Sequence, residues 1–369
     1  MVRLARLSLS LLGAFVGLAV GEFALRSLAP PSPLMDLRGL HEVRPDRPWL
    51  YGLRAGAGGV INETGWVRYR INADGFRDRR YVRPKPSGTF RVIVLGDSIS
   101  FGYGVYEVDA FPQRMEEQLA RLAAEPRIEV VNLGVGGYNP YNELELLRDV
   151  GPTYQPDLVL VQFCINDLND PTLHFDRQSR IHLGTVPDAA YPDPSVRRRG
   201  ARMPPAWLRA CRRSQLCSRL DDWLLARMAR EPRDEERRAA VVPVTAGDGP
   251  EWSWLDRRYG EMAGAAAAMG ARFALVAFPY PQQLDGDDPH PVQERLLAMG
   301  ERHGWPTLDL LPAFRRAARE RPNDALFMDW WHPTPLGHRL AAEEVVSGLA
   351  CAGLLPPEAD ELCPRRAAR

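Results

Sequence analysis

The chain has 369 residues, of which 45% are hydrophobic and 25% are charged. This composition is typical of a globular protein with one large α/β domain and smaller additions. The chain carries 47 basic and 47 acidic residues, so its formal net charge is zero. A neutral chain offers no electrostatic basis for binding nucleic acid, and we exclude that class of function.

An apolar segment near the amino terminus is flanked by arginines. Arg3 and Arg6 precede an apolar run from Leu7 to Gly21, which Glu22 interrupts. This pattern is typical of a signal peptide or a signal anchor, and a buried core helix is the alternative. The basic residues before the run predict that the rest of the chain lies outside the cytoplasm. We expect residues 1–26 to anchor the protein in the inner membrane, or to be cleaved if the protein is secreted.

A proline-rich linker of residues 27–34 follows, and its composition predicts a stiff, extended segment. Residues 35–88 are expected to form a small extension that contains a β-hairpin. Within it, residues 67–71 alternate between apolar and polar side chains, and Asn72-Ala73-Asp74-Gly75 is a turn signal.

From about residue 89 onward, apolar runs alternate with amphipathic segments. Buried strands are predicted at residues 91–95, 128–133, 157–163, 272–278 and 307–310. Helices are predicted at residues 112–124, 141–150, 252–269, 291–303 and 335–351. The alternation predicts a mainly parallel, five-stranded sheet with helices on both faces.

The alternation breaks between about residues 170 and 250. Residues 205–230 in this stretch have the pattern of one or two amphipathic helices. An insertion of this length above the strand ends predicts a lid or a substrate platform. Residues 356–369 are expected to be a C-terminal tail.

The chain has five cysteines. In an oxidising compartment, Cys211 with Cys217 and Cys351 with Cys363 would form two local disulfides, which leaves Cys164 as a thiol. Reduced, mostly buried thiols are the alternative. The spacings within these pairs match no zinc-binding pattern.

A serine follows the first predicted strand at a turn, in the segment Gly96-Asp97-Ser98. Such a serine presents its hydroxyl at the carboxyl edge of the sheet, where open α/β sheets place their ligands. We therefore predict that Ser98 is a nucleophile. A turn serine that caps the next helix is the alternative.

A base for this serine is predicted near the carboxyl end of the chain. Asp329 and His332 are separated by two residues, so a loop can turn the carboxylate onto one imidazole nitrogen while the other faces Ser98. Thr334-Pro335 then opens a helix, which places the pair near the sheet edge. A metal site formed by Asp97, Asp329 and His332 is the alternative, but we expect neither a metal nor a cofactor.

Two further segments supply candidate donors for an oxyanion. Gly136-Gly137 follows the second strand, and glycine lets a backbone N–H approach a substrate oxygen closely. Asn166 follows the third strand and can aim its amide at the same point. With the N–H of Ser98, these groups form a predicted oxyanion hole. A tight turn or a helix cap would explain each segment alone, but all of them converge on one edge of the sheet.

The ordered set of segments resembles the SGNH branch of the GDSL-type hydrolases. Ser98 matches the nucleophile of that family, Gly137 and Asn166 match its oxyanion donors, and His332 matches its base with Asp329 three residues earlier. The extension before residue 90 resembles that of membrane-anchored bacterial members. The resemblance implies a flavodoxin-like three-layer fold over residues 89–355 and ester hydrolysis without a metal.

One position departs from the family pattern. The third segment usually reads Gly-x-Asn-Asp, but here it is Cys164-Ile165-Asn166-Asp167. We predict that Cys164 ends the third strand as a buried thiol with ordinary backbone geometry and is not the nucleophile.

These features together predict a serine esterase or deacylase that acts outside the cytoplasm. Its substrate would be a small acyl or acetyl ester, a lipid or an acylated glycan. An O-acyltransferase that uses the same residues to modify an envelope polysaccharide is an alternative. A catalytically silent envelope-binding protein is a further alternative.

Overall fold

The computed structural model describes most of the chain, namely residues 13, 16–25, 27, 40–44, 46–49, 51–61, 67–122, 126–168, 173–175, 181–183, 250–284, 291–321, 325–329 and 331–364. The predicted insertion at about 170–250 lies outside the described residues, including its helical segment at 205–230. Within the insertion, the structure describes only residue 250 and two short strands, β8 (Leu173–Phe175) and β9 (Ile181–Leu183).

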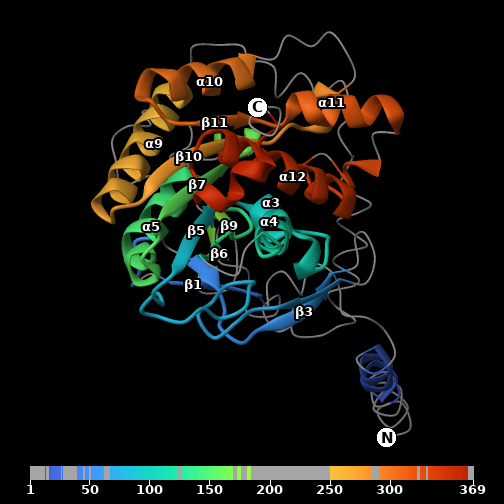
Figure 1. Ribbon diagram of the computed structural model, residues 1–369. Coiled ribbons are helices and arrows are strands. Elements are labelled where there is room, and N and C mark those ends of the chain that lie inside the picture. The colour runs from blue at the N-terminus through green and yellow to red at the C-terminus, as the bar shows by residue number, and fades with distance from the viewer. Residues whose placement is uncertain are drawn as a thin grey trace, which may run out of the picture.

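A parallel sheet forms the centre of the molecule (Figure 1). Its strands lie side by side in the order β11-β10-β7-β5-β6. If the five strands are renumbered along the chain, this order reads 2-1-3-4-5 from the β6 edge, which is the flavodoxin-like order. The predicted five-stranded parallel sheet is therefore confirmed. The strands are β5 (Thr89–Leu95), β6 (Arg127–Asn132), β7 (Leu158–Phe163), β10 (Arg272–Ala277) and β11 (Thr307–Asp309).

Helices cover both faces of this sheet. α4 (Phe111–Leu119) packs with α12 (Pro335–Cys351), and α5 (Pro140–Tyr154) packs with α9 (Pro250–Ala268). Right-handed crossovers place these two pairs on opposite faces. α10 (Pro291–His303) lies against α9, where Arg295 stacks on Trp252. The predicted three-layer α/β fold is thus confirmed.

The strands are buried on both faces, which explains their continuous apolar sequences. All residues of β7 are buried, as are the last five residues of β5. The chain changes direction between β5 and β7, because β6 lies on one side of β5 while β7, β10 and β11 lie on the other. Ligands of open α/β sheets bind at such a switch point.

Two helices differ from the predicted pattern. α4 ends at Leu119 instead of residue 124, because the chain tightens there into i→i+3 bonds such as Leu122 N–H to Leu119 C=O. α11 (Leu311–Glu320) was not predicted, since its arginine-rich sequence resembles a solvated loop. It is amphipathic and buries Leu311 and Phe314.

The extension before the main sheet forms two small antiparallel pairs. β1 (His41–Val43) pairs with β2 (Tyr51–Leu53), and β3 (Gly58–Ile61) pairs with β4 (Val67–Arg70). The predicted turn at Asn72-Ala73-Asp74-Gly75 is present after β4. It does not join two strands of a hairpin, because the partner of β4 precedes it in the chain.

Side chains seal the outer edge of the main sheet along β6. The Val130 N–H donates to Glu116 Oε1 (3.3 Å), and the Val130 carbonyl accepts from the Tyr81 hydroxyl (2.6 Å). The Asn132 N–H donates to Asp78 Oδ2 (2.8 Å). Tyr81 and Asp78 belong to the extension, so this segment takes the place of a further strand.

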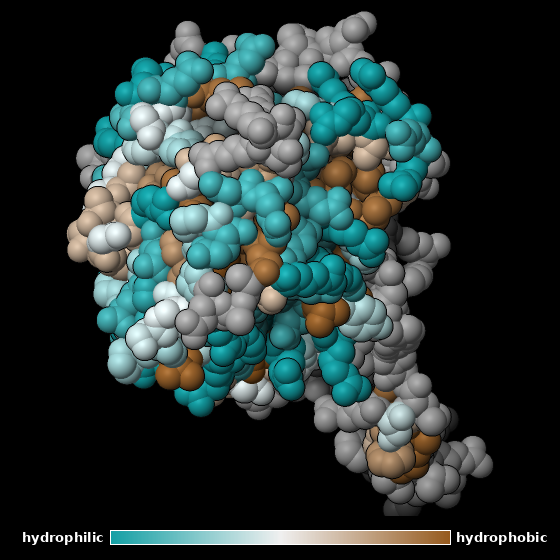
Figure 2. Space-filling view, in the orientation of Figure 1, coloured by the Kyte–Doolittle hydropathy of each residue, from teal (hydrophilic) through white to brown (hydrophobic). Residues whose placement is uncertain are grey.

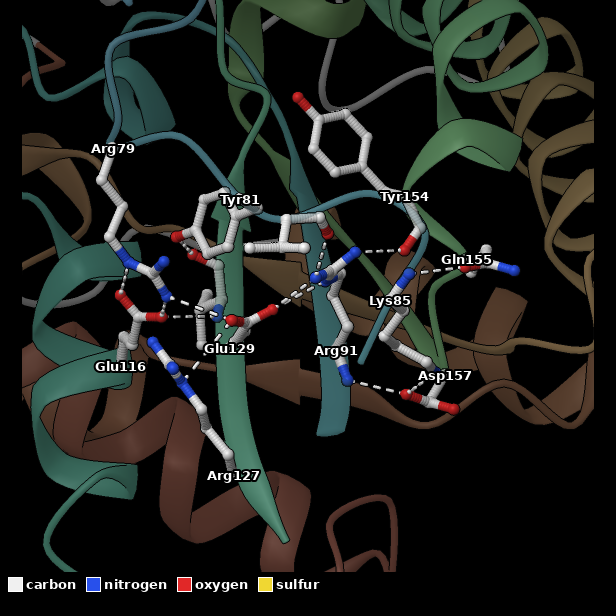
Figure 3. A network of polar contacts seen from close by, with 12 residues as sticks. Arg79, Tyr81, Lys85, Arg91, Glu116, Arg127, Glu129, Tyr154, Gln155 and Asp157 are labelled. Carbon is white, nitrogen blue, oxygen red and sulfur yellow. Dashed lines mark hydrogen bonds and ion pairs between the residues drawn. The ribbon is translucent and has the colours of Figure 1, made fainter. Parts of the chain in front are cut away.

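A network of charged side chains joins the extension to the sheet (Figure 3). The Arg91 side chain is fully buried and lies 2.6 Å from Glu129 Oε2. It also donates to the carbonyls of Tyr154 (2.7 Å) and Val82 (3.0 Å). Arg79 adds a second contact to Glu129 from the extension, at 3.6 Å. Strands β5 and β6, helix α5 and the extension therefore share one buried ion pair.

Residues 16–25 are helical and stand clear of the main body (Figures 1 and 2). Large apolar side chains are exposed on this helix, namely Val16, Leu18, Val20 and Phe23. In the part of the chain that the structure describes, no helix combines the length and the apolarity needed to cross a membrane.

A disulfide links Cys351, at the end of α12, to Cys363. Of the two alternatives for these cysteines, the disulfide is the one present, and it ties the 3₁₀ helix η5 (Pro357–Leu362) to α12. The other predicted pair, Cys211 and Cys217, lies outside the described residues.

Candidate active site

The turn after β5 holds Ser98 at the start of the one-turn helix α3 (Ser98–Phe101). The Asp97 carboxylate caps this helix by accepting the Ile99 N–H (2.9 Å). A Cβ on Gly96 would lie only 2.3 Å from Ser100 Oγ and 2.4 Å from Gln162 Oε1. The turn therefore requires glycine at this position, and it leaves Ser98 half-buried at the sheet edge.

Ser98, His332 and Asp329 form a continuous hydrogen-bonded chain. Ser98 Oγ lies 2.9 Å from His332 Nε2, and His332 Nδ1 lies 2.6 Å from Asp329 Oδ2. The second carboxylate oxygen of Asp329 accepts the backbone N–H groups of Trp331 and His332, both at 2.8 Å. Asp329 is thus held in place by its own loop, and the imidazole is oriented with Nε2 toward the serine.

The charge of Asp329 follows from these contacts. Burial raises the pKa of this carboxyl, but the hydrogen bonds and charge of His332 and the two backbone donors outweigh burial. The pKa is therefore held below its usual value. A charged Asp329 keeps the proton on His332 Nδ1, so Nε2 is free to accept the proton of Ser98.

The loop after β6 lies against the turn Gly96-Asp97-Ser98, which carries the predicted nucleophile and is called the nucleophile turn below. The Val135 N–H donates to the Gly96 carbonyl (3.1 Å), and Asn132 Nδ2 donates to the Ser100 carbonyl (2.7 Å). Gly137 follows with a φ of +80°, which favours glycine. A Cβ at Gly137 would lie 3.1 Å from the Tyr51 hydroxyl. Gly137 therefore lies close against Tyr51 of β2 in the extension.

The end of β7 contacts the same turn. Gln162 Oε1 accepts from both the N–H (3.2 Å) and the hydroxyl (2.9 Å) of Ser100. Asn166 lies four residues further on, in the 3₁₀ helix η2 (Ile165–Leu168). The side chain of Asn166 lies outside the described residues, so its predicted amide contact stays a prediction. The backbone of its segment nevertheless follows β7 at the predicted edge.

Cys164 lies directly after β7 and is buried, with 4% of its surface exposed. It is a thiol and not half of a disulfide. Among the described residues, Gln155 is the one non-glycine with a positive φ, so Cys164 keeps ordinary backbone geometry. Its N–H donates to Asp167 Oδ2 (3.1 Å). The prediction that Cys164 is a buried thiol outside a disulfide is confirmed, although β7 ends one residue earlier, at Phe163.

Two carboxyl groups lie buried behind the site. Asp167 Oδ2 accepts from the Tyr259 hydroxyl (3.4 Å), whereas neither oxygen of Glu143 has a hydrogen-bond partner in the described part of the chain. Burial, together with the charges of Asp167 and Asp97, raises the pKa of Glu143 well above its usual value. Burial thus favours the neutral form of Glu143.

The arrangement does not match the metal alternative. Asp97 caps α3, and each nitrogen of His332 faces one of its two partners, Ser98 or Asp329. No group of three or more His, Cys, Asp or Glu side chains within the described ranges is arranged to hold a metal ion. His332 and Asp329 are instead linked to Ser98 in one hydrogen-bonded chain.

Sequence reasoning missed Gln162 and Glu143. Both could have been recognised from the sequence, because each is a polar residue in an otherwise apolar stretch. Gln162 interrupts the run Leu158–Phe163, and Glu143 lies among the buried residues of α5. A polar side chain in such a position needs a partner or a neutral form.

The model of the GDSL-like Lipase/Acylhydrolase family matches residues 94–340. No curated protein sequence matches the chain. Among solved structures, the chain is similar to an alpha/beta hydrolase enzyme from the metagenome of Lake Arreo, Spain (15% identity, TM-score 0.44, covering 71% of this chain and 95% of that one). It is also similar to TesA (16% identity, TM-score 0.42, covering 72% of this chain and 99% of that one). A third similar structure is the acetyl xylan esterase AlAXEase (14% identity, TM-score 0.43, covering 70% of this chain and 100% of that one).

Proposed function

The chain belongs to the GDSL-like Lipase/Acylhydrolase family and is a hydrolase of ester bonds, and we propose that Ser98, His332 and Asp329 are its catalytic triad. The observation that carries this proposal is the unbroken chain from Asp329 Oδ2 through the imidazole to Ser98 Oγ, at 2.6 and 2.9 Å. These distances suit a serine activated by a histidine base.

In the proposed mechanism, Ser98 Oγ attacks the ester carbonyl and gives its proton to His332 Nε2. Asp329 stabilises the resulting imidazolium through Nδ1–H. The backbone N–H groups of Ser98 and Gly137 and the amide of Asn166 stabilise the oxyanion. The imidazolium then protonates the leaving alcohol as the C–O bond breaks. Water, deprotonated by His332, attacks the acyl-enzyme and releases the acid and Ser98.

The test is labelling with a fluorophosphonate probe, followed by mass spectrometry and by kinetics on short acyl and acetyl esters. We expect the probe to modify Ser98 and the Ser98→Ala variant to lose both labelling and hydrolysis while it stays folded. Ser253→Ala, at an exposed serine on α9, is the matched control and should behave like the wild type. Full activity in a folded Ser98→Ala variant would rule out the serine mechanism.

We also propose that the enzyme acts outside the cytoplasm, tethered to the inner membrane by residues 1–26 or secreted after their cleavage. The Arg-flanked apolar run supports this location. The Cys351–Cys363 disulfide supports it independently, because structural disulfides persist in oxidising compartments. A fusion of alkaline phosphatase after Pro33 should be active, and an inactive fusion retained in the cytoplasm would overturn this topology.

The substrate in this proposal is an acyl or acetyl ester carried by a small molecule, a lipid or a glycan. Hydrolysis is expected instead of acyl transfer to a sugar. Product analysis distinguishes the two reactions, because hydrolysis releases free acid in proportion to the alcohol whatever sugar acceptor is added. Acceptor-dependent loss of free acid would favour the transferase.

A further inference from the structure

A compact turn that begins at Asn72 in the extension places Arg77 next to the nucleophile turn. Asn72 Oδ1 accepts the N–H groups of Asp74 (2.9 Å) and Phe76 (3.0 Å), and Asn72 Nδ2 donates to the carbonyl of Asp78 (3.0 Å). These bonds close the chain on both sides of Arg77. The turn precedes residue 94, where the match to the family model begins.

The guanidinium of Arg77 binds the backbone that follows Ser98. Its Nη1 donates to the carbonyls of Phe101 (3.1 Å) and Gly102, and its Nη2 donates to the carbonyl of Val105 (2.6 Å). Phe101 is the last residue of α3, whose first residue is Ser98. Arg77 is 1% exposed, so these bonds form away from solvent.

Aromatic rings hold the same guanidinium in place. It lies 4.0 Å from the ring centroid of Tyr69 and 5.3 Å from that of Phe101. The Tyr69 hydroxyl accepts the Gly104 N–H (2.6 Å), so β4 of the extension contacts the same loop directly. Burial lowers the pKa of Arg77 to about 10, which leaves the side chain charged at neutral pH.

The nucleophile helix needs such external support. α3 has four residues, and a single turn does not hold its shape in isolation. The carbonyls at its end have no partners within the helix. A planar, charged donor that binds several of them at once fixes the end of the turn and therefore the direction in which Ser98 points.

We propose that Arg77 is a positioning residue for Ser98, so that the extension is part of the catalytic unit. This inference rests on the proposed role of Ser98 as nucleophile. Arg77 touches no reacting atom, and it acts through the carbonyls of residues 101, 102 and 105. Its loss should displace Ser98 relative to His332 and leave substrate binding largely intact.

The test compares Arg77→Lys and Arg77→Gln with a matched control, Arg80→Gln. Arg80 lies on the same segment, but it is exposed and pairs only with Asp74 among the residues described. Active sites are counted by titration with a fluorophosphonate, and kcat is expressed per titrated site. If Arg77 had only a structural role, its substitution would lower the number of titrated active sites and leave kcat per site unchanged.

We expect Arg77→Gln to lower kcat per site by roughly 10- to 100-fold with little change in KM, the cost of a small misplacement of a catalytic group. Arg77→Lys should be intermediate, because one ammonium cannot reproduce the planar fork. Arg80→Gln should match the wild type. Millimolar guanidinium should partly restore the probe-labelling rate of Arg77→Gln but not that of Ser98→Ala.

Wild-type kcat per site in folded Arg77 variants would overturn this inference while leaving the proposed function intact. If Arg77→Gln does not fold, Arg77→Lys decides by the same criterion. If the wild type itself shows no labelling at Ser98 and no ester hydrolysis, the proposed function fails and this inference fails with it.

Discussion

Asp329 contributes to the site through its charge and its fixed position. Its two oxygens are fully engaged, one by the imidazole and one by two backbone N–H groups. We expect Asp329→Asn to lower kcat by about 10³–10⁴-fold and to change KM much less, since the amide favours the wrong imidazole tautomer. Steady-state kinetics on an acyl ester checks this, and a variant with normal kcat would remove Asp329 from the mechanism.

The same carboxylate determines the shape of the pH profile. The pKa of Asp329 lies below its usual value, so this carboxyl stays charged at pH values at which an ordinary aspartate begins to gain a proton. We therefore expect Asp329 not to contribute to the loss of activity on acidification. The acid limb of log kcat/KM against pH should have a slope of one. A slope of two would mean that a second group, such as Asp329, also gains a proton there.

The proposed catalytic residues could be predicted because each lies next to a recognisable element. Ser98 comes after an apolar strand, and His332 precedes the Thr334-Pro335 helix start that the structure confirms. The residues that support them could not be predicted in the same way. Gln162 and Arg77 act on the nucleophile turn from elements distant in sequence, and neither has a local pattern that names its partner.

At the scale of helices and strands, His338 joins α12 to α4. It is fully buried, and its Nδ1 accepts the Phe111 N–H (3.2 Å). Burial, with the charges of His332 and Arg77, lowers the pKa of His338 to about 3. The folded state therefore holds this imidazole neutral, whereas the unfolded state protonates it near its ordinary pKa of about 6.5.

The sign of the pH effect follows from proton binding. Between about pH 6.5 and pH 3 the unfolded state binds more protons at this residue, so stability falls as the pH falls through that window. His338→Asn keeps an acceptor for the Phe111 N–H but does not titrate. Urea unfolding at pH 7.5 and pH 5 measures how much the free energy of unfolding falls between the two pH values. We expect this fall to be about 2 kcal/mol smaller in the variant than in the wild type. Equal losses would contradict a neutral, buried His338.

The positions of the strands and their parallel direction followed from their apolar sequences and from the alternation with helices, whereas the flavodoxin-like order was implied only by the family resemblance. The positions of α10 and α12 were predicted to the residue, because each helix begins at a proline and Thr334 caps α12. α11 was missed because its buried face is only a few residues wide and its other positions are arginine-rich. The pairing of the short strands in the extension depends on contacts with the main domain, which no local pattern contains.

At the scale of the whole molecule, the Arg91–Glu129 pair holds the extension, two strands and α5 together (Figure 3). Glu129→Ala would leave the buried charge of Arg91 uncompensated. We expect it to lower the free energy of unfolding by about 3–5 kcal/mol, whereas the double variant Arg91→Met, Glu129→Leu should recover much of that loss. Denaturant titration of these two variants measures this, with Arg121→Met as the exposed control. Equal destabilisation by the single and double variants would contradict it.

The sealed border of β6 has a consequence for how this protein meets other copies of itself. The backbone groups that would accept another strand are already occupied by Tyr81, Asp78 and Glu116. At the opposite border, β11 is only three residues long and offers a poor template. Two of the three blocking side chains lie before residue 89, so a fragment that begins at residue 89, the first residue of β5, would leave these backbone groups of β6 without their partners. Such a fragment would be prone to intermolecular strand pairing at β6. We therefore expect the extension before residue 89 to protect the protein against aggregation as well.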